Sequence, residues 1–341
     1  MPKEMVGLSL KWVSPFWYWG CEQNCKECFV GEKKDVVTPM DERKKTIDVL
    51  AENGTEEMFL CGGNPILDPL ISETVDYIHS QGISVELLSN SWNFRANKSI
   101  GDIDDFLAKI DDKAATFWGM DAETHDEICG CEGSFDRLME NLGIISEKGY
   151  AIDAIINVVP KNREDVYETI KTLKQRVNIT KVWIQRMFPY GNAIKNNYAE
   201  MQLKPEDLNV ILEQLLKAKG DFDLKEISFD SVPPLCMVDK KYLNFIERYK
   251  RGLSFWALDY KCRLFGESLD VVDPELALFE GRPIYEVGNP AEGIKTDRRT
   301  LEILDMEYLP EECKHCGVDD CFGGYLIRDE KKNLRVDPML D

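Results

Sequence analysis

The stretch WYWGCEQNCKECFVGEKK, residues 17–34, places three cysteines within eight positions, Cys21, Cys25 and Cys28. It follows an apolar, strand-like segment at Val6–Trp12. Zinc normally needs a fourth protein ligand, and its sites usually show two close pairs of cysteines. Three thiolates in one loop instead favour a [4Fe–4S] cluster with one iron left open to a small molecule that binds through an amine and a carboxylate. A chance trio of structural thiols is the alternative.

Working outward from this loop, strand-like runs alternate with amphipathic, helix-like segments. The predicted strands lie near Val6–Trp12, Glu57–Leu60, Ser84–Leu88, Ala115–Met120, Ala151–Val158 and Lys181–Met187. Thr38 is a suitable cap for the first helix, with Pro39 at its first position and Gly54 past its end. Gly82 and Gly149 end the second and fourth helices. Ile103, Phe106, Leu107 and Ile110 form one face of the third, and Val166, Ile170 and Leu173 belong to the fifth.

Six such units of about 30 residues predict a parallel sheet with helices outside it. The handedness of the crossovers allows a doubly wound sheet or a curved partial barrel. In both, chemistry collects at the carboxyl ends of the strands. From about Lys204 the pattern changes to a helix at Pro205–Lys219 and then to turn-rich pieces. We therefore expect three parts, a barrel domain at 1–200, a connecting helix and linker at 201–230, and a cysteine-rich domain at 231–341.

Composition narrows the possible partners. The chain has 341 residues, 43% hydrophobic and 30% charged, which is ordinary for a globular protein, and its net charge is −20. Such an acidic surface repels nucleic acid and anionic lipid, although acidity can also serve solubility alone. The N-terminus does not resemble a signal peptide, and no run approaches 18 apolar residues. We expect a cytoplasmic protein, in which cysteines, 11 in this chain, serve as metal ligands more often than as disulfide partners.

The chain resembles the radical S-adenosylmethionine (radical SAM) superfamily over roughly residues 6–195. The resemblance rests on CxxxCxxC after the first strand, on FLCGGNP and LLSNS after the second and third, on WGMDAETHDEICGCEGSFDRLMENL, and on QRMFPYGNA. It implies a partial (β/α)6 TIM-type barrel, a [4Fe–4S] cluster on Cys21, Cys25 and Cys28, and SAM on the open iron. The implied SAM contacts are Phe29, Gly62, Gly63, Asn64, Ser89, Asn90, Asp121, Asn157 and Met187.

Several positions depart from the pattern of the family. Glu27 stands where an aromatic residue usually shields the adenine, a role that Phe29 can take over. Asn64 replaces the usual Glu, and Gly119 and Cys129 replace small polar and basic residues. The resemblance therefore implies a SAM pocket that is less standard than its cluster loop, and the sequence names no further catalytic residue.

A second cysteine group lies near the C-terminus, in ECKHCGVDDCFGG. It resembles the SPASM and shorter twitch extensions of radical SAM enzymes, which carry auxiliary clusters. A full SPASM extension has seven cysteines, and several are absent here. One auxiliary [4Fe–4S] cluster is the economical interpretation, with zinc as the alternative. The expected ligands are Cys262, Cys313, Cys316 and Cys321, and Cys236 is either an alternative ligand or a buried thiol.

The remaining cysteines and the histidines give weaker signals. Cys61 ends the second strand and is expected inside the barrel as a small apolar filler. Cys129 and Cys131 are either unreactive loop thiols or a reactive pair near SAM. We expect His79 on a surface helix and His125 in a structural role, with His315 donating a hydrogen bond to sulfur. The aromatic run of residues 16–19 is expected to shield the cluster or pack the barrel mouth, with peptide binding as the alternative.

The resemblance implies an enzyme that uses a reduced cluster to form a 5′-deoxyadenosyl radical. Our first hypothesis is the modification of a ribosomally made peptide by crosslinking, epimerisation or residue excision. Because the chain begins almost at the first strand, a separate leader-binding protein is then expected beside the precursor peptide and a reductant such as ferredoxin or flavodoxin. The second hypothesis is oxidation or rearrangement of a small molecule in cofactor or metabolite biosynthesis. A non-enzymatic iron–sulfur carrier is the third.

Overall fold

The protein is described here from a computed structural model. It covers residues 12–28, 36–52, 54–186 and 203–229, the single residues 192, 196 and 201, and the two short strands 327–328 and 334–335. The predicted cluster ligands Cys262, Cys313, Cys316 and Cys321 lie outside the described residues, as does Cys236, and so do the predicted SAM contacts Phe29 and Met187. The domain boundaries proposed from the sequence stay predictions.

Within the described residues, seven parallel strands form one sheet in the order β1 to β7, so each strand pairs with its neighbour in sequence. In this part of the chain β1 and β7 are the outermost strands. The strands are β1 Trp12–Val13, β2 Glu57–Leu60, β3 Ser84–Ser89, β4 Asp112–Phe117, β5 Ile152–Val158, β6 Ile179–Arg186 and β7 Glu226–Phe229. A separate antiparallel pair joins β8 Ile327–Arg328 to β9 Leu334–Arg335. The predicted parallel α/β architecture is confirmed.

The bounds of β3, β5 and β6 differ from the prediction by one or two residues, and two larger differences concern β7 and β4. β7 lies within the segment that was expected to be a linker, where it pairs with β6 and extends the sheet. β4 begins and ends three residues before the predicted strand, at Asp112 and Phe117. The reason for the second difference is that the chain must leave the sheet at Trp118 so that Asp121 can cap the next helix.

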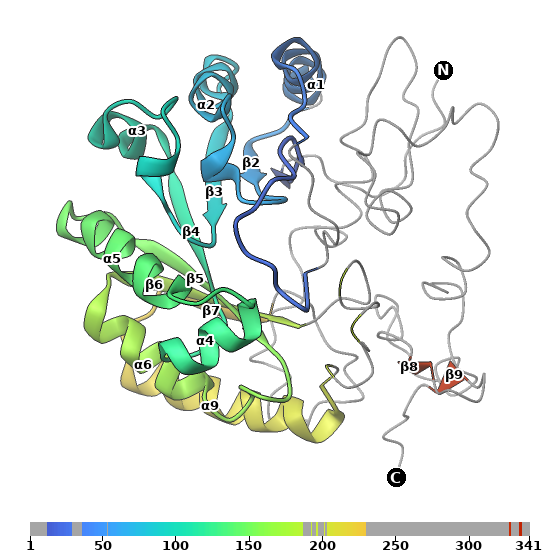
Figure 1. The fold of residues 1–341 in the computed structure, drawn as a ribbon, viewed down its shortest axis with the longest axis vertical. Coiled ribbons are helices and arrows are strands. Elements are labelled where there is room, and N and C mark those ends of the chain that lie inside the picture. The colour runs from blue at the N-terminus through green and yellow to red at the C-terminus, as the bar shows by residue number, and fades with distance from the viewer. Residues whose placement is uncertain are drawn as a thin grey trace.

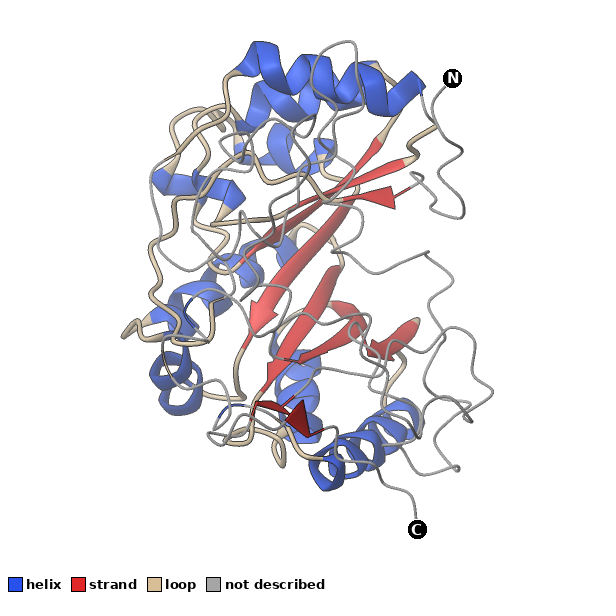
Figure 2. Ribbon diagram, turned by 90° about the vertical axis from the view of Figure 1, so that its right-hand side faces the viewer, coloured by secondary structure: helices blue, strands red, loops and turns tan. Residues whose placement is uncertain are grey.

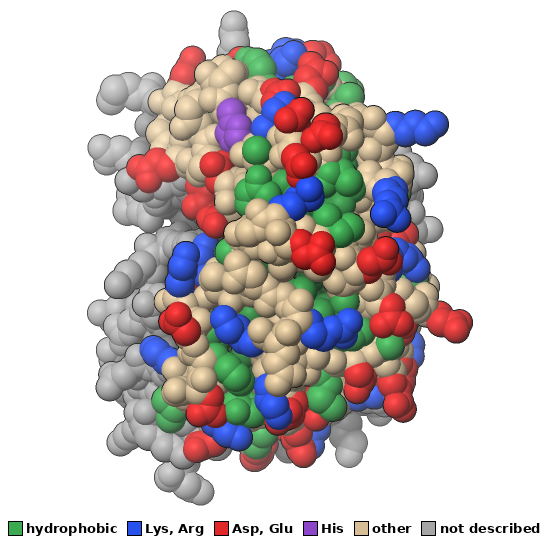
Figure 3. Space-filling view, turned by 90° about the vertical axis from the view of Figure 1, so that its left-hand side faces the viewer, with side chains coloured by type: hydrophobic (Ala, Val, Ile, Leu, Met, Phe, Trp, Pro, Cys, Tyr) green, Lys and Arg blue, Asp and Glu red, His purple; other side chains and the backbone are tan. Residues whose placement is uncertain are grey.

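Helices cover one side of the sheet, as Figures 1 and 2 show. They are α1 Met40–Glu52, α2 Ile71–Ser80, α3 Ile103–Lys109, α4 Ala122–Cys129, α5 Ser134–Glu147, α6 Val166–Arg176 and α9 Pro205–Asp221, with short 3-10 turns η1 Pro65–Leu67 and η2 Phe94–Ala96. In Figure 3, acidic and basic side chains are intermixed over an outer face of the molecule. No helix in the described part of the chain is long and apolar enough to cross a membrane.

The two faces of the sheet have different interiors, because successive side chains of a strand point to opposite faces. In β2, Met58 and Leu60 belong to the large core between sheet and helices. Phe59 and Cys61, on the alternate positions, belong to a smaller cluster on the inner face of the sheet. The other buried members of this inner cluster are Phe16, Trp19, Ala114, Ile155 and Trp183. Cys61 is therefore inside the barrel, as the sequence predicted, 3.0 Å from the Ser14 hydroxyl.

Charged residues occupy the inner face below this apolar cluster, near the amino ends of the strands. Lys181 on β6 contacts Asp153 on β5 at 2.7 Å and Asp112 on β4 at 3.4 Å. Glu86 on β3 is 1% exposed, and its Oε1 atom has no hydrogen-bond partner among the described residues. Burial first, and then the charge of Glu57, raise the pKa of Glu86 well above its ordinary value. We call Glu86, Asp112, Asp153 and Lys181 the basal charged layer.

Candidate metal and cofactor site

The three N-terminal cysteines lie in the loop that follows β1, at the carboxyl edge of the sheet. Cys25 is buried, whereas Cys21 and Cys28 are partly exposed. A turn closes the loop, with the Cys28 amide donating to the Cys25 carbonyl at 3.2 Å. The Asn90 side chain, directly after β3, donates from Nδ2 to Cys21 Sγ at 3.1 Å. Hydrogen bonds of this kind to sulfur stabilise a thiolate and tune a bound cluster, so these residues fit an iron–sulfur site.

The loop after β2 is attached to the cluster loop through its backbone. The amides of Gly63 and Asn64 donate to the carbonyls of Tyr18 and Gly20 at 3.0 and 2.7 Å. A Cβ atom on Gly63 would lie 2.2 Å from the Gly20 carbonyl oxygen. Gly62 has a φ of +120°, which side chains disfavour. Both glycines therefore let two loops touch, and this close approach explains them without a ligand.

Asn64 and Ser89, two of the predicted SAM contacts, are buried and bonded to each other. The Ser89 hydroxyl donates to Asn64 Oδ1 at 2.8 Å. Asn64 Nδ2 donates to the Ser91 hydroxyl at 2.9 Å and to both carboxylate oxygens of Glu22 at 3.0 and 2.9 Å. Glu22 was not selected from the sequence, although it directly follows Cys21. The sequence feature that could have identified Glu22 is its acidic side chain inside the cysteine motif.

The remaining predicted contacts lie on neighbouring strands of the same edge. Asp121 caps α4, and its side chain accepts from the Thr124 amide at 2.9 Å. Asn157 lies near the end of β5, where its backbone carbonyl accepts a hydrogen bond from Asn162 Nδ2 at 2.9 Å. The structure thus places Asp121 after β4 and Asn157 on β5. Their roles in SAM binding stay predictions.

Two described residues after β6, Asn192 and Asn196, contact the cluster loop, across a separation of more than 160 residues. Asn192 donates from its backbone to the Cys28 carbonyl at 2.8 Å and from Nδ2 to the Cys25 carbonyl at 3.1 Å. Asn196 donates to the Lys26 carbonyl at 3.0 Å. The QRMFPYGNA segment was singled out by resemblance, but its asparagine bonds to the backbone of the cysteine loop could not be inferred from sequence.

Glu27 lies inside the loop, one residue before Cys28, and is 8% exposed. Its Oε2 atom has no hydrogen-bond partner among the described residues. Burial raises the pKa of Glu27 to about 7, and its own backbone hydrogen bond and Lys26 oppose that rise. An acid stands here where the resemblance led us to expect an aromatic side chain.

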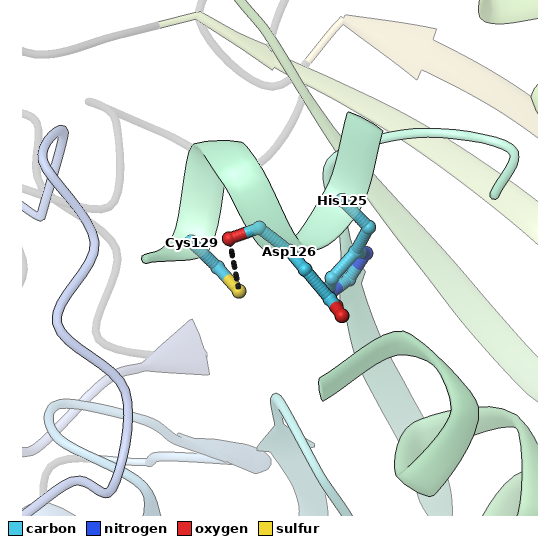
Figure 4. A group of neighbouring side chains, drawn as sticks. All are labelled: His125, Asp126 and Cys129. Carbon is cyan, nitrogen blue, oxygen red and sulfur yellow. Dashed lines mark hydrogen bonds between the residues drawn. The ribbon is translucent and has the colours of Figure 1, made fainter. Parts of the chain in front are cut away.

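A different trio has the compactness of a single-ion site. His125, Asp126 and Cys129 on α4 offer ligand atoms within 4.8 Å of one another (Figure 4). Yet His125 Nδ1 accepts from the Trp118 amide at 3.2 Å, which leaves the proton of the neutral ring on Nε2 and no free nitrogen lone pair. The Asp126 carboxylate accepts from two backbone amides at 2.6 and 2.8 Å, at Gly133 and Phe135. These hydrogen bonds join α4 to the start of α5, so the trio has a structural role in the turn between the two helices.

Cys129 and Cys131, the two thiols at the junction of α4 and α5, differ in burial. Burial raises the pKa of Cys129 to about 11, while a hydrogen bond from Ser134 opposes that rise, so Cys129 is a poor thiolate. Cys131 is partly exposed. Both pack in one side-chain cluster with Cys25 and Cys28. Gln23 links the cluster loop to α5, since its Nε2 lies 2.5 Å from the Ser134 hydroxyl.

In the described part of the chain, His125, Asp126 and Cys129 are the one group whose ligand atoms all lie within 4.8 Å of one another. Cys21, Cys25 and Cys28 do not form such a group.

Comparison with known proteins shows which proteins this part of the chain resembles. Residues 18–173 match the sequence profile of the Radical SAM superfamily. The chain is 26% identical over 161 residues to the AdoMet-dependent heme synthase of Methanosarcina barkeri, covering 46% of this chain and 45% of that protein. It is 22% identical over 156 residues to the antilisterial bacteriocin subtilosin biosynthesis protein AlbA of Bacillus subtilis, covering 45% and 34%. The match thus spans less than half the length of either relative.

Solved structures share the fold. A structure of native anSMEcpe with bound AdoMet, another name for SAM, and the Kp18Cys peptide has a TM-score of 0.56 at 14% identity, covering 95% of this chain and 93% of that one. The crystal structure of Streptococcus suis SuiB bound to the precursor peptide SuiA has a TM-score of 0.54 at 15% identity, covering 64% and 48%. Residues 18–173, a little under half of the chain, are therefore similar to the Radical SAM superfamily in sequence, and the fold is shared with the solved structures of radical SAM enzymes.

Proposed function

We propose that this chain is a radical SAM enzyme that modifies a ribosomally made peptide by crosslinking, epimerisation or excision of a residue. The observation that carries the enzymatic part is the three-cysteine loop at the carboxyl edge of the sheet. The loops after β2 and β3 are hydrogen-bonded to it through Gly63, Asn64 and Asn90. In parallel α/β folds this edge is where chemistry is built.

Different residues of this edge have different proposed roles. Cys21, Cys25 and Cys28 would hold a [4Fe–4S] cluster, and the loops beside them would hold SAM. When bound and reduced, this pair supplies a 5′-deoxyadenosyl radical that abstracts hydrogen from an unactivated C–H bond. The chain must exclude water from that radical. Phe16 and Trp19 suit this task, because their rings pack edge to face at 5.7 Å on the inner face, where the apolar cluster lies.

The peptide substrate is supported by relatives rather than by a contact in this chain. AlbA is named for bacteriocin biosynthesis, and SuiB was crystallised with its precursor peptide. The second candidate, a small-molecule substrate, is favoured by the relative that makes heme.

Further parts of the proposal concern partners and the second cysteine group. We infer one auxiliary [4Fe–4S] cluster on Cys262, Cys313, Cys316 and Cys321, a separate leader-binding protein, a ferredoxin or flavodoxin as reductant, and a cytoplasmic location. The acidic net charge of −20 opposes nucleic acid as a partner.

Metal content tests the two clusters. Anaerobically reconstituted protein should bind about eight iron and eight sulfide per chain, as two cubanes require. Replacing Cys21, Cys25 and Cys28 together by Ala should leave about half of the iron. A wild-type protein with about four iron and one zinc would overturn the auxiliary cluster and leave the first site intact.

Product analysis tests the reaction. With dithionite and SAM the protein should release 5′-deoxyadenosine, and Cys25→Ala should not. A short peptide encoded beside the gene should accelerate this release and change in mass or stereochemistry. If no such peptide reacts while a tetrapyrrole or another small molecule does, the peptide proposal is wrong and the second candidate replaces it.

A further inference from the structure

Asn64 is a buried amide whose two side-chain protons are both engaged in hydrogen bonds. It is 0% exposed. The Ser89 oxygen accepts from the amides of Ser91 and Trp92 at 3.2 and 2.8 Å, so its own proton goes to Asn64 Oδ1. This fixes the orientation of the Asn64 amide and turns its two protons toward Ser91 and Glu22. Asn64 therefore has no side-chain donor left for a ligand, and its amide positions the Glu22 carboxylate.

The Asn64 amide donates its hydrogen bond to the Glu22 carboxylate. The Glu22 side chain is exposed, yet both carboxylate oxygens lie 2.9–3.0 Å from the buried amide nitrogen, so the carboxylate is held in one place. No Lys or Arg side chain of the described residues pairs with it. A carboxylate has about four acceptor positions, and the Asn64 amide occupies only part of them. Among the described residues, Asn64 alone donates a hydrogen bond to the Glu22 carboxylate.

The charge around Glu22 is unfavourable without a cation. A [4Fe–4S]²⁺ core with three thiolate ligands carries a net negative charge, and Glu22 adds another next to the first ligand. Like charges this close repel, and a positively charged or hydrogen-donating group between them removes the repulsion. SAM carries such a group at the amino-acid end, which the open iron would bind.

We propose that the Glu22 carboxylate, held by Asn64, accepts a hydrogen bond from the α-amino group of SAM and so positions the amino-acid end of the cofactor at the cluster. The inference rests on the proposed function, because it requires SAM at this loop. Glu22 supplies the acidic group from within the cysteine motif, and Asn64 and Ser89 act through it.

The test compares three ligands with and without the Glu22 charge. S-Adenosylmethionine and S-adenosylhomocysteine both carry the α-amino group, whereas methylthioadenosine lacks the amino-acid end. Equilibrium binding to the reconstituted protein under anaerobic conditions should weaken about 10-fold for the first two on Glu22→Gln, the size of a charged hydrogen bond, and should not change for the third. The change that SAM causes in the EPR spectrum of the reduced cluster should become smaller.

Glu123→Gln is the matched control, since Glu123 is an exposed acid on α4 and its replacement removes the same charge. It should leave all three affinities unchanged. Equal affinities of wild type and Glu22→Gln for SAM would overturn the inference, and weakening for SAM alone would assign Glu22 to the sulfonium and overturn it as well. A wild-type protein that binds iron but no SAM would instead overturn the proposed function.

Discussion

The two ends of the strands hold polar side chains in different ways. At the carboxyl edge, Asn64, Asn90 and Asn192 lie in loops or follow strands and bond to the cluster loop. At the amino end, the basal charged layer comes from positions inside the strands, with Asp153 and Lys181 facing each other in register. The first arrangement surrounds the cysteine loop, whereas the second links neighbouring strands at the other end of the sheet. We therefore expect changes at the carboxyl edge to affect ligand binding, and changes at the amino end to affect stability alone.

The largest loss of stability is expected where the cluster loop joins α1. Arg43 is 0% exposed and bonds to both oxygens of Asp68, at 2.5 and 3.1 Å, and to the Thr38 carbonyl at 2.8 Å. Arg43→Met would leave Asp68 as a buried, unpaired charge. The free energy of unfolding of the cluster-free protein should fall by about 3–5 kcal/mol in denaturant titrations.

Lys44→Met is the control for this prediction, because Lys44 pairs with Glu73 on the exposed side of the same helix at 3.0 Å. It should cost less than about 1 kcal/mol. A loss at Arg43 no greater than at Lys44 would show that the buried pair does not hold the edge together.

The next effect is a pH dependence at His125. Burial lowers the pKa of its ring to about 4 from an ordinary value of 6.5, with the charge of Asp126 opposing that change. Between these two values the unfolded state binds more protons than the folded state, so stability falls as the pH falls through this window. The wild type should lose up to about 3 kcal/mol between pH 7 and pH 4 relative to His125→Gln. A constant difference between the two proteins across this range would contradict the burial of a neutral ring.

A smaller effect is expected where the two loops of the edge touch. Gly63→Ala would place a methyl group 2.2 Å from the Gly20 carbonyl oxygen and 2.6 Å from the carbonyl carbon of Trp19. Separating the loops should cost about 2 kcal/mol of stability and should also weaken SAM binding in equilibrium measurements.

Gly143→Ala in α5 is the matched control for Gly63, since nothing lies within 4 Å of its added methyl group. It should stabilise the protein by about 0.5–1 kcal/mol and leave SAM binding unchanged. If Gly63→Ala keeps full SAM affinity, contact between these loops is not part of the site.

The smallest loss is expected at the amino end. Lys181→Met removes the partner of Asp153, and because Lys181 is partly exposed the cost should be about 1–2 kcal/mol. The double variant with Asp153→Asn should recover part of it. SAM affinity should equal that of the wild type. Weaker SAM binding in Lys181→Met would remove the distinction between the two ends of the strands.

Much of the fold followed from local pattern. The predicted strand at Glu57–Leu60 has the same bounds in the structure, and the strands ending at Val158 and near Ser89 differ by a residue. These segments are buried on both faces, so their apolar runs are continuous and easy to recognise. β7 was missed because it is only four residues long and follows a helix that looked like a connector.

The candidate site divides in the same way. Cys21, Cys25 and Cys28 were identified from spacing, because a cluster needs its thiolates close together in one loop. The partners of that loop are distant in sequence, with Asn64 42 residues from Glu22 and Asn192 167 residues from Cys25. The choice among many possible partners is made when parallel strands bring their carboxyl ends to one edge.

Residue type and spacing were thus sufficient for the cysteine loop, the βα alternation and the family resemblance, since each depends on neighbours along the chain. Folding assigned the remaining roles. It made His125 a hydrogen-bond acceptor for Trp118 rather than a ligand, and it buried Asn64 so that Glu22 is the exposed group. The reason is that burial and hydrogen-bond partners depend on which segments meet in space, and in this protein those segments are separated by whole βα units.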